Sequence, residues 1–187
     1  MADKQGAELR TRFLDWGMQY YVSGRLAAKA GQMPVHGNLL HHAVELFLKA
    51  ALIDAATLKE MKEKWKHRLP TIWEKFKARY KDSALNRFDA SISALHHFDS
   101  IRYPDKLVAE GMWGSITWAS RPPTKAFGGG RRQPRYEVII NEVDDLMLEV
   151  LRRADINPKY FGNQLMSGEA RKAITYENPW SAEWRSN

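Results

Sequence analysis

The chain has 187 residues, no cysteine and a formal net charge of +7. This length suits one domain that buries its own core. The lack of cysteine in the sequence excludes a disulfide framework, a thiolate nucleophile and a cysteine-based zinc site. The first residues lack the apolar segment of a secretory signal, and no stretch approaches the roughly 18 apolar residues of a membrane span. We therefore expect a soluble, cytoplasmic protein with no membrane partner.

The positive charge is concentrated in two segments. Residues 57–81 contain nine Lys and Arg against three Asp and Glu, and residues 119–136 contain five basic residues and no acidic one. Localised charge of this kind attracts polyanions such as RNA. The alternative interpretation is a lysine-rich surface that is simply solvated.

Residues 8–31 are predicted to form the first helix, because apolar side chains recur there at steps of three and four residues. The stripe consists of Leu9, Phe13, Trp16, Tyr20 and Ala27. Gly31 and Pro34 then interrupt the pattern. Since short connections between helices favour antiparallel neighbours, the first two helices are expected to form a hairpin.

Residues 37–56 are the most apolar stretch of the chain and predict a central, buried helix. Four polar side chains share one sector of this helix, about 100° wide. They are His41, His42, Glu45 and Lys49. Because burying a charge is costly unless the charge is paired or hydrogen-bonded, this sector must face water, a partner or an internal polar network.

Three interpretations of the polar sector stay open. It is a solvent-exposed strip in which Glu45 and Lys49 form an ordinary surface pair, or it lines a cleft for a phosphate-bearing ligand. The third is a metal site, for which His41 and Glu45, one turn apart, would need a further ligand from another segment. The candidates for that ligand are His96, His97 and Asp99. The spacing does not fix their geometry, so we predict no metal and no other cofactor.

Capping boxes, in which a hydroxyl and a carboxylate three residues later satisfy free amide groups, predict two short helices over residues 57–66 and 71–81. The boxes are formed by Thr57 with Glu60 and by Thr71 with Glu74. Ser83 is predicted to cap a further helix that runs to about residue 99.

Beyond residue 102, apolar and polar residues alternate in two short runs that flank a connection rich in Gly and Pro. This pattern predicts an inserted β-hairpin over about residues 113–140. Its tip carries Arg131 and Arg132 next to three glycines, together with Phe127. Cationic groups with an aromatic side chain suit contact with RNA. The alternative is a disordered or dimer-swapping loop.

A last long helix is predicted over residues 142–154, with Asn141 as its cap and acidic residues in its first turn, where they complement the helix dipole. We expect a helical domain over residues 1–157 that includes the β-hairpin. Residues 158–187 are expected to form a C-terminal tail that is partly irregular, with one short helix near residues 167–174. This tail docks through Trp180 or Trp184, or else it frays.

Several segments together resemble the HEPN family of nucleotide-binding helical domains. In chain order they are the pair Tyr20–Tyr21 followed by Arg25 and Ala27, then HHAVELFLKAAL, KHRLPTIW and IRYP. The resemblance spans about residues 13–105, and residues 142–154 would be the last core helix. In that family the second helix carries His, Glu and Lys as His41 or His42, Glu45 and Lys49 stand here. A Gly-His-x-Leu element of the family corresponds to Lys66-His67-Arg68-Leu69.

The resemblance implies a mainly α, antiparallel bundle of four to five helices that pairs into a homodimer. Many HEPN domains are ribonucleases with an Arg-x(4–6)-His motif, and this sequence departs from that motif. No histidine follows Arg102 at that spacing, and eight residues separate Arg87 from His96. Because the chemistry needs a histidine close to the arginine, we expect a nucleotide- or RNA-binding protein that does not cleave its ligand.

The predicted binding residues are His41, His42, Glu45, Lys49, Arg131 and Arg132. Two alternative functions stay open. One is a metal-independent ribonuclease with a non-standard site, for which His67 and Arg102 are the catalytic candidates. The other is a pure protein-interaction module that partners a nucleotidyltransferase or a toxin component.

Overall fold

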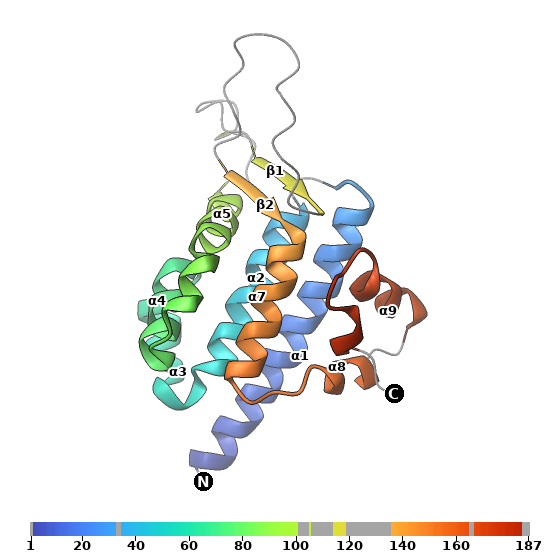
Figure 1. The fold of residues 1–187 in the computed structure, drawn as a ribbon. Coiled ribbons are helices and arrows are strands. Elements are labelled where there is room, and N and C mark those ends of the chain that lie inside the picture. The colour runs from blue at the N-terminus through green and yellow to red at the C-terminus, as the bar shows by residue number, and fades with distance from the viewer. Residues whose placement is uncertain are drawn as a thin grey trace.

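The protein is mainly helical in the computed structural model, as predicted (Figure 1). The structure describes residues 2–32, 35–100, 105, 114–118, 136–164 and 167–184. The long helices are α1 (Ala2–Lys29), α2 (Val35–Ala51), α4 (Leu69–Tyr80), α5 (Asp89–Ser100) and α7 (Ile140–Arg153). The short ones are α3 (Leu58–Glu60), α8 (Lys159–Gln164) and α9 (Gly168–Thr175). Among the described helices, none is both long enough and apolar enough to cross a bilayer.

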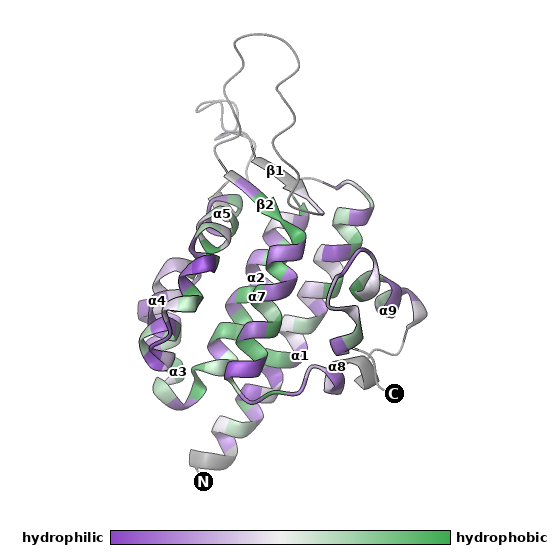
Figure 2. Cartoon of the chain, in the orientation of Figure 1, coloured by the Kyte–Doolittle hydropathy of each residue, from purple (hydrophilic) through white to green (hydrophobic). Residues whose placement is uncertain are grey.

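Helix α2 is the central helix of the bundle. It packs along α1 and also contacts α4, α5 and α7. In Figure 1, α7 lies in front of α2, with α4 and α5 on one side and α1 on the other. Apolar side chains of α2 such as Leu40, Val44 and Phe47 are almost fully buried, and the hydropathy colouring in Figure 2 shows green faces on the helices that meet here. The prediction of a central, buried second helix is confirmed.

Helix α1 turns a different face inward from the one that its periodicity indicated. Leu14, Met18 and Tyr21 are buried, whereas Trp16 is 56% exposed and Tyr20 is 38% exposed. The reason is the close approach of α2 to the glycines of α1. A Cβ atom added at Gly24 would lie 2.9 Å from the side chain of Leu40. The predicted stripe therefore lies partly at the surface, with its aromatic residues beside the interface.

Two short strands pair with each other, but they do not form a hairpin. Strands β1 (Gly114–Thr117) and β2 (Tyr136–Ile139) run parallel, with Gly114 opposite Tyr136 and Thr117 opposite Ile139. Alternation marks a strand but does not give its direction, and a connection of a dozen or more residues is long enough for a parallel crossover. The predicted hairpin tip lies in residues 119–135, outside the described residues.

The segment between α2 and α5 is less regular than predicted. The Thr57 hydroxyl accepts a hydrogen bond from the Glu60 amide at 3.2 Å, as the capping box requires. The helix then widens into a π-helix, η2 (Met61–Trp65), and ends at Lys66. Helix α4 begins before Thr71 because Pro70 stabilises its first turn. Asp82 caps the next segment in place of Ser83, and that segment is the 3₁₀ helix η3 (Ser83–Phe88), which leads into α5.

The C-terminal tail packs onto α1. Helix α9 and the 3₁₀ helix η4 (Ser181–Trp184) follow α8, so the tail contains more helix than expected. Trp184 is 2% exposed and its ring lies 5.6 Å from that of Tyr21, which identifies Trp184 as the buried anchor. Helix α7 starts at Ile140, so Asn141 lies inside the helix and is not its cap.

Candidate polar site on helix α2

Glu45 is the centre of a buried polar cluster on α2. Its carboxylate accepts a hydrogen bond from Lys49 Nζ at 2.6 Å and lies 3.0 Å from His67 Nδ1. His42 Nδ1 and His41 Nε2 lie 3.5 Å and 3.8 Å from the same carboxylate oxygen, Oε2. Glu45 is 2% exposed and Lys49 is 7% exposed, so this is not a strip of solvated side chains. The interpretation as a surface pair is therefore wrong, and the sector forms an internal network.

The network holds the Glu45 carboxylate in its charged form. Burial alone would raise the pKa of Glu45, but hydrogen bonds from His42 and Lys49, the charge of Lys49 and the hydrogen bond from His67 outweigh burial and lower the pKa to about 2. Glu45 is therefore an anion throughout the physiological pH range, and it fixes the orientation of the groups around it.

Lys49 connects α2 to the segment that carries His67. Its ammonium donates to Glu45 Oε1 and, at 2.7 Å, to the backbone carbonyl of Lys66. The π-helix η2 brings this carbonyl to the site, since Lys66 is the residue at which that helix ends. Lys66 has a φ of 49°, a conformation that is uncommon for residues other than glycine. Strained backbone of this kind and π-helical turns both occur often at functional sites.

A cavity of about 310 Å³ opens next to this network. It is lined by Lys49, Met61, Lys62, Lys66 and His67, and we call it the lysine cavity. Its volume is at the small end of the range for ligand sites, which is about 300–1,000 Å³. Three ammonium groups and one imidazole therefore line a space that is large enough for a phosphate group with part of a nucleoside.

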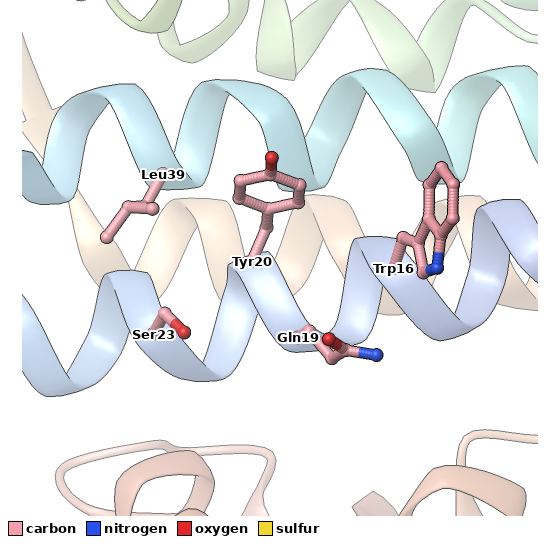
Figure 3. A pocket seen from close by; sticks show the side chains of 5 residues that line it. All are labelled: Trp16, Gln19, Tyr20, Ser23 and Leu39. Atoms are coloured by element: carbon pink, nitrogen blue, oxygen red, sulfur yellow. The ribbon is translucent and has the colours of Figure 1, made fainter.

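A second cavity of about 320 Å³ lies between α1 and α2, on the side of Tyr20 (Figure 3). Trp16, Gln19, Tyr20 and Ser23 of α1 line it together with Leu39 of α2. We call it the aromatic groove. The ring of Tyr20 lies 5.4 Å from that of His42, so the groove reaches the edge of the polar cluster.

The structure brings together five of the residues that the sequence singled out, namely His41, His42, Glu45, Lys49 and His67. Arg102, Arg131 and Arg132 lie outside the described residues. Lys62 and Lys66 were not predicted as binding residues, and Lys66 was named only as the first residue of the element Lys66–Leu69. The signal for them was the charge of residues 57–81, but only the path of the chain after η2 shows which of those lysines reach the site.

Comparison with known proteins identifies no relative of this chain: no protein-family model matches it, and no curated protein or solved structure is significantly similar to it.

Proposed function

We propose that the protein binds a phosphate-bearing ligand, either a nucleotide or a segment of RNA, in the lysine cavity and does not cleave it. The observation that carries this proposal is the gathering of Lys49, Lys62, Lys66 and His67 around one space. Ammonium groups at this density favour an anion over a neutral ligand.

The network around Glu45 supports the proposal because it holds the Lys49 ammonium in position to donate to a ligand. Lys49 has three N–H groups, of which two are used by Glu45 and the carbonyl of Lys66. The third can donate to a ligand in the lysine cavity. An ammonium held in place loses less side-chain entropy on binding than a freely rotating one.

We also propose that the chain is HEPN-like. Several segments of the sequence resemble those of the HEPN family, and two of these segments, on α2 and at Lys66–Leu69, lie in contact. The His-Glu-Lys set of α2 contacts the element Lys66–Leu69 through Lys49 and Glu45. A bundle in which these two segments met no common site would speak against the resemblance.

The non-catalytic part of the proposal rests on the sequence, in which no histidine follows Arg102 at the spacing of the ribonuclease motif. His67 Nδ1 lies 3.0 Å and 3.1 Å from the two oxygens of Glu45, and a carboxylate can only accept, so Nδ1 carries the proton. This partner orients the ring, which makes His67 the residue that the ribonuclease alternative would use. Its proposed arginine partner, Arg102, lies outside the described residues.

Binding of labelled RNA and of labelled nucleotides to a double variant, K62A/K66A, tests this function. We expect binding to weaken by about tenfold or more, because hydrogen bonds to charged groups are worth about 1.5–3 kcal/mol each, and we expect the salt dependence to become shallower. The matched control is K59A/K64A, which removes the same charge from the same segment outside the cavity. Equal loss in both double variants would contradict the proposal.

The same incubations test the absence of catalysis. Gel analysis of the labelled RNA should show intact RNA with the wild-type protein. Cleavage by the wild type that is lost in both R102A and H67A would overturn the non-catalytic assignment and establish the ribonuclease alternative.

We further propose that the protein is a homodimer that pairs through the aromatic groove. Trp16 and Tyr20 expose large apolar surfaces there, and Val35 is also half exposed. Sedimentation velocity should give the mass of a dimer for the wild type and of a monomer for W16E. A wild type that sediments as a monomer at high concentration would contradict this proposal.

A further inference from the structure

Three atoms that commonly bind metal ions face one another inside the polar cluster. The ligand atoms of His41, His42 and Glu45 all lie within 4.8 Å of one another. Glu45 Oε2 is 3.5 Å from His42 Nδ1 and 3.8 Å from His41 Nε2. Ligands of one tetrahedral ion with bonds of about 2.0–2.2 Å lie about 3.3–3.6 Å apart. Small rotations of the side chains, with the hydrogen of His42 moved from Nδ1 to Nε2, would thus place all three atoms on one ion.

His41 and Glu45 are each held in place by a further hydrogen bond. His41 Nδ1 lies 3.1 Å from the backbone carbonyl of Leu95. A carbonyl only accepts, so Nδ1 carries a hydrogen, and Nε2 is the atom that faces Glu45. In the neutral ring, which is the form that binds metal ions, Nε2 carries the lone pair. Lys49 binds Glu45 through Oε1, while Oε2 faces His41 and His42 and also accepts from His67. A backbone carbonyl on the far nitrogen of a histidine is the usual outer shell of a metal-binding histidine.

The three side chains stand on one rigid support. Positions i, i+1 and i+4 of α2 carry them, and α2 is the central helix of the bundle. Access comes from the side of His42, whose side chain is 26% exposed. His67 lies at the solvent side and donates from Nδ1 to Glu45 Oε2 at 3.0 Å, so it holds the carboxylate in place and is not itself a ligand. A water molecule would take the fourth position.

We propose that His41, His42 and Glu45 bind one divalent transition-metal ion, with zinc as the best match. Two imidazoles and one carboxylate suit zinc and its neighbours, whereas calcium and magnesium require more oxygen ligands. Sequence spacing pointed to His41 and Glu45 but sought the third ligand on another segment; the structure supplies it as the adjacent residue, His42. This site does not depend on the proposed phosphate binding, since it uses different atoms and is tested without phosphate.

Calorimetric titration of the untagged, chelator-treated protein with zinc sulfate tests the proposal, together with the visible spectrum of the cobalt form. The wild type should bind one ion per chain and give the intense absorption of tetrahedral cobalt. H42A and E45Q should weaken binding by about 100-fold or more, because even outer-shell changes cost about 10–100-fold. H67A and H97A should stay within about tenfold of the wild type.

The H42A and H67A variants distinguish the proposed zinc site from zinc bound at the surface by His42 and His67. A surface pair formed by His42 and His67 would lose zinc equally in H42A and H67A, and that result would overturn the proposal. So would a wild type that binds no zinc, or an H42A protein that binds it as tightly as the wild type. E45Q leaves Lys49 without its carboxylate, so circular dichroism checks the fold of every variant, and H42A with H67A decides the question even if E45Q unfolds.

Discussion

Asp144 and Arg25 form a buried ion pair that holds α7, α1 and the tail together. The Arg25 guanidinium contacts both oxygens of Asp144, and Tyr21 donates to the same carboxylate at 2.5 Å. Arg25 also donates to the carbonyls of Ala173 and Tyr176 in the tail. Asp144 is one of the acidic residues that were expected to complement the dipole of this helix, but its side chain is fully buried against Arg25.

Replacing Asp144 by asparagine should destabilise the protein by about 3–5 kcal/mol, because the Arg25 charge stays buried without its counter-charge. Urea denaturation measures the change in the free energy of unfolding. The neighbouring substitution D145N is the matched control. Asp145 pairs with Arg87, whose side chain is half exposed, so its loss should cost about 1 kcal/mol or less. Similar losses in the two variants would show that the buried pair contributes little.

His36 should make stability depend on pH. Burial lowers its pKa below the ordinary value of 6.5, and the hydrogen bond with the Gln32 carbonyl offsets this in part. As the pH falls below 6.5, the unfolded chain takes up a proton at this ring while the folded chain resists it, so the free energy of unfolding falls. H36Q should show a shallower decrease in urea titrations between pH 6.5 and 5. Superimposable pH profiles would refute this assignment.

At the scale of elements, glycines set the distance between α1 and α2. A Cβ atom at Gly17 would lie 2.6 Å from the ring of Phe47, and one at Gly24 would lie 2.9 Å from Leu40. The same holds for Gly37 of α2, where a Cβ atom would lie 2.4 Å from the ring of Phe98 on α5. Close contact at these points allows α2 to be surrounded by its neighbours on most sides.

Gly24→Ala should cost about 1–3 kcal/mol, since the added methyl group forces Leu40 and the helix backbone apart. The control, Gly6→Ala, lies in the same helix with nothing within 4 Å of the added Cβ atom. It should be neutral or stabilising by up to about 1 kcal/mol, through helix propensity alone. Thermal unfolding of both proteins measures the two changes in stability. Equal changes would show that helix propensity, and not packing against Leu40, determines the effect at Gly24.

The sequence predicted where helices form better than how they begin and what they pair with. The apolar run located α2, and the acidic first turn located α7 although Asn141 is not its cap. The 3.6-residue pattern misjudged α1, because glycine carries no hydropathy signal and yet decides which face meets α2. Caps shifted where a neighbouring residue offered a better start, as Pro70 did for α4. Strand direction was wrong, because alternation is the same in parallel and antiparallel pairs.

For the whole molecule, the tail completes the core on the side of α1. Trp184 packs on Tyr21, and Tyr21 in turn donates to Asp144, so the last described helix is linked to the buried ion pair. In Figure 1 the tail segments lie beside α1, far in sequence from it. Cooperative unfolding of the tail with the bundle follows from this linkage.

Trp184→Ala should lower the free energy of unfolding by about 3–5 kcal/mol, as expected for a large aromatic side chain lost from a core. Tyr160→Ala is the control, because Tyr160 is 44% exposed and lies outside the aromatic groove, and surface substitutions usually stay within about 0.5 kcal/mol. Denaturation followed by tryptophan fluorescence reports both. A W184A protein as stable as Y160A would show that the tail docks without stabilising the bundle.

The candidate site was predictable as a set of residue types but not as an arrangement. The spacing of His41, Glu45 and Lys49 follows directly from helical geometry. The approach of Lys66 and His67 instead depends on the π-helix η2 and on the positive φ of Lys66, and a lysine in the sequence does not predict a positive φ. His42, the proposed third metal ligand, stands beside His41 on α2, so its nearness to Glu45 follows from the same helical geometry.

His41, Glu45 and Lys49 all stand on α2, and neighbouring helices enclose α2. The backbone positions of these three residues should therefore be the same with and without a ligand. A small ion or anion would meet a surface that needs only fast side-chain rotations, and no slow movement of the backbone, before capture. Association should then be a single kinetic step whose observed rate rises linearly with ligand concentration, without the plateau that a slow conformational step produces.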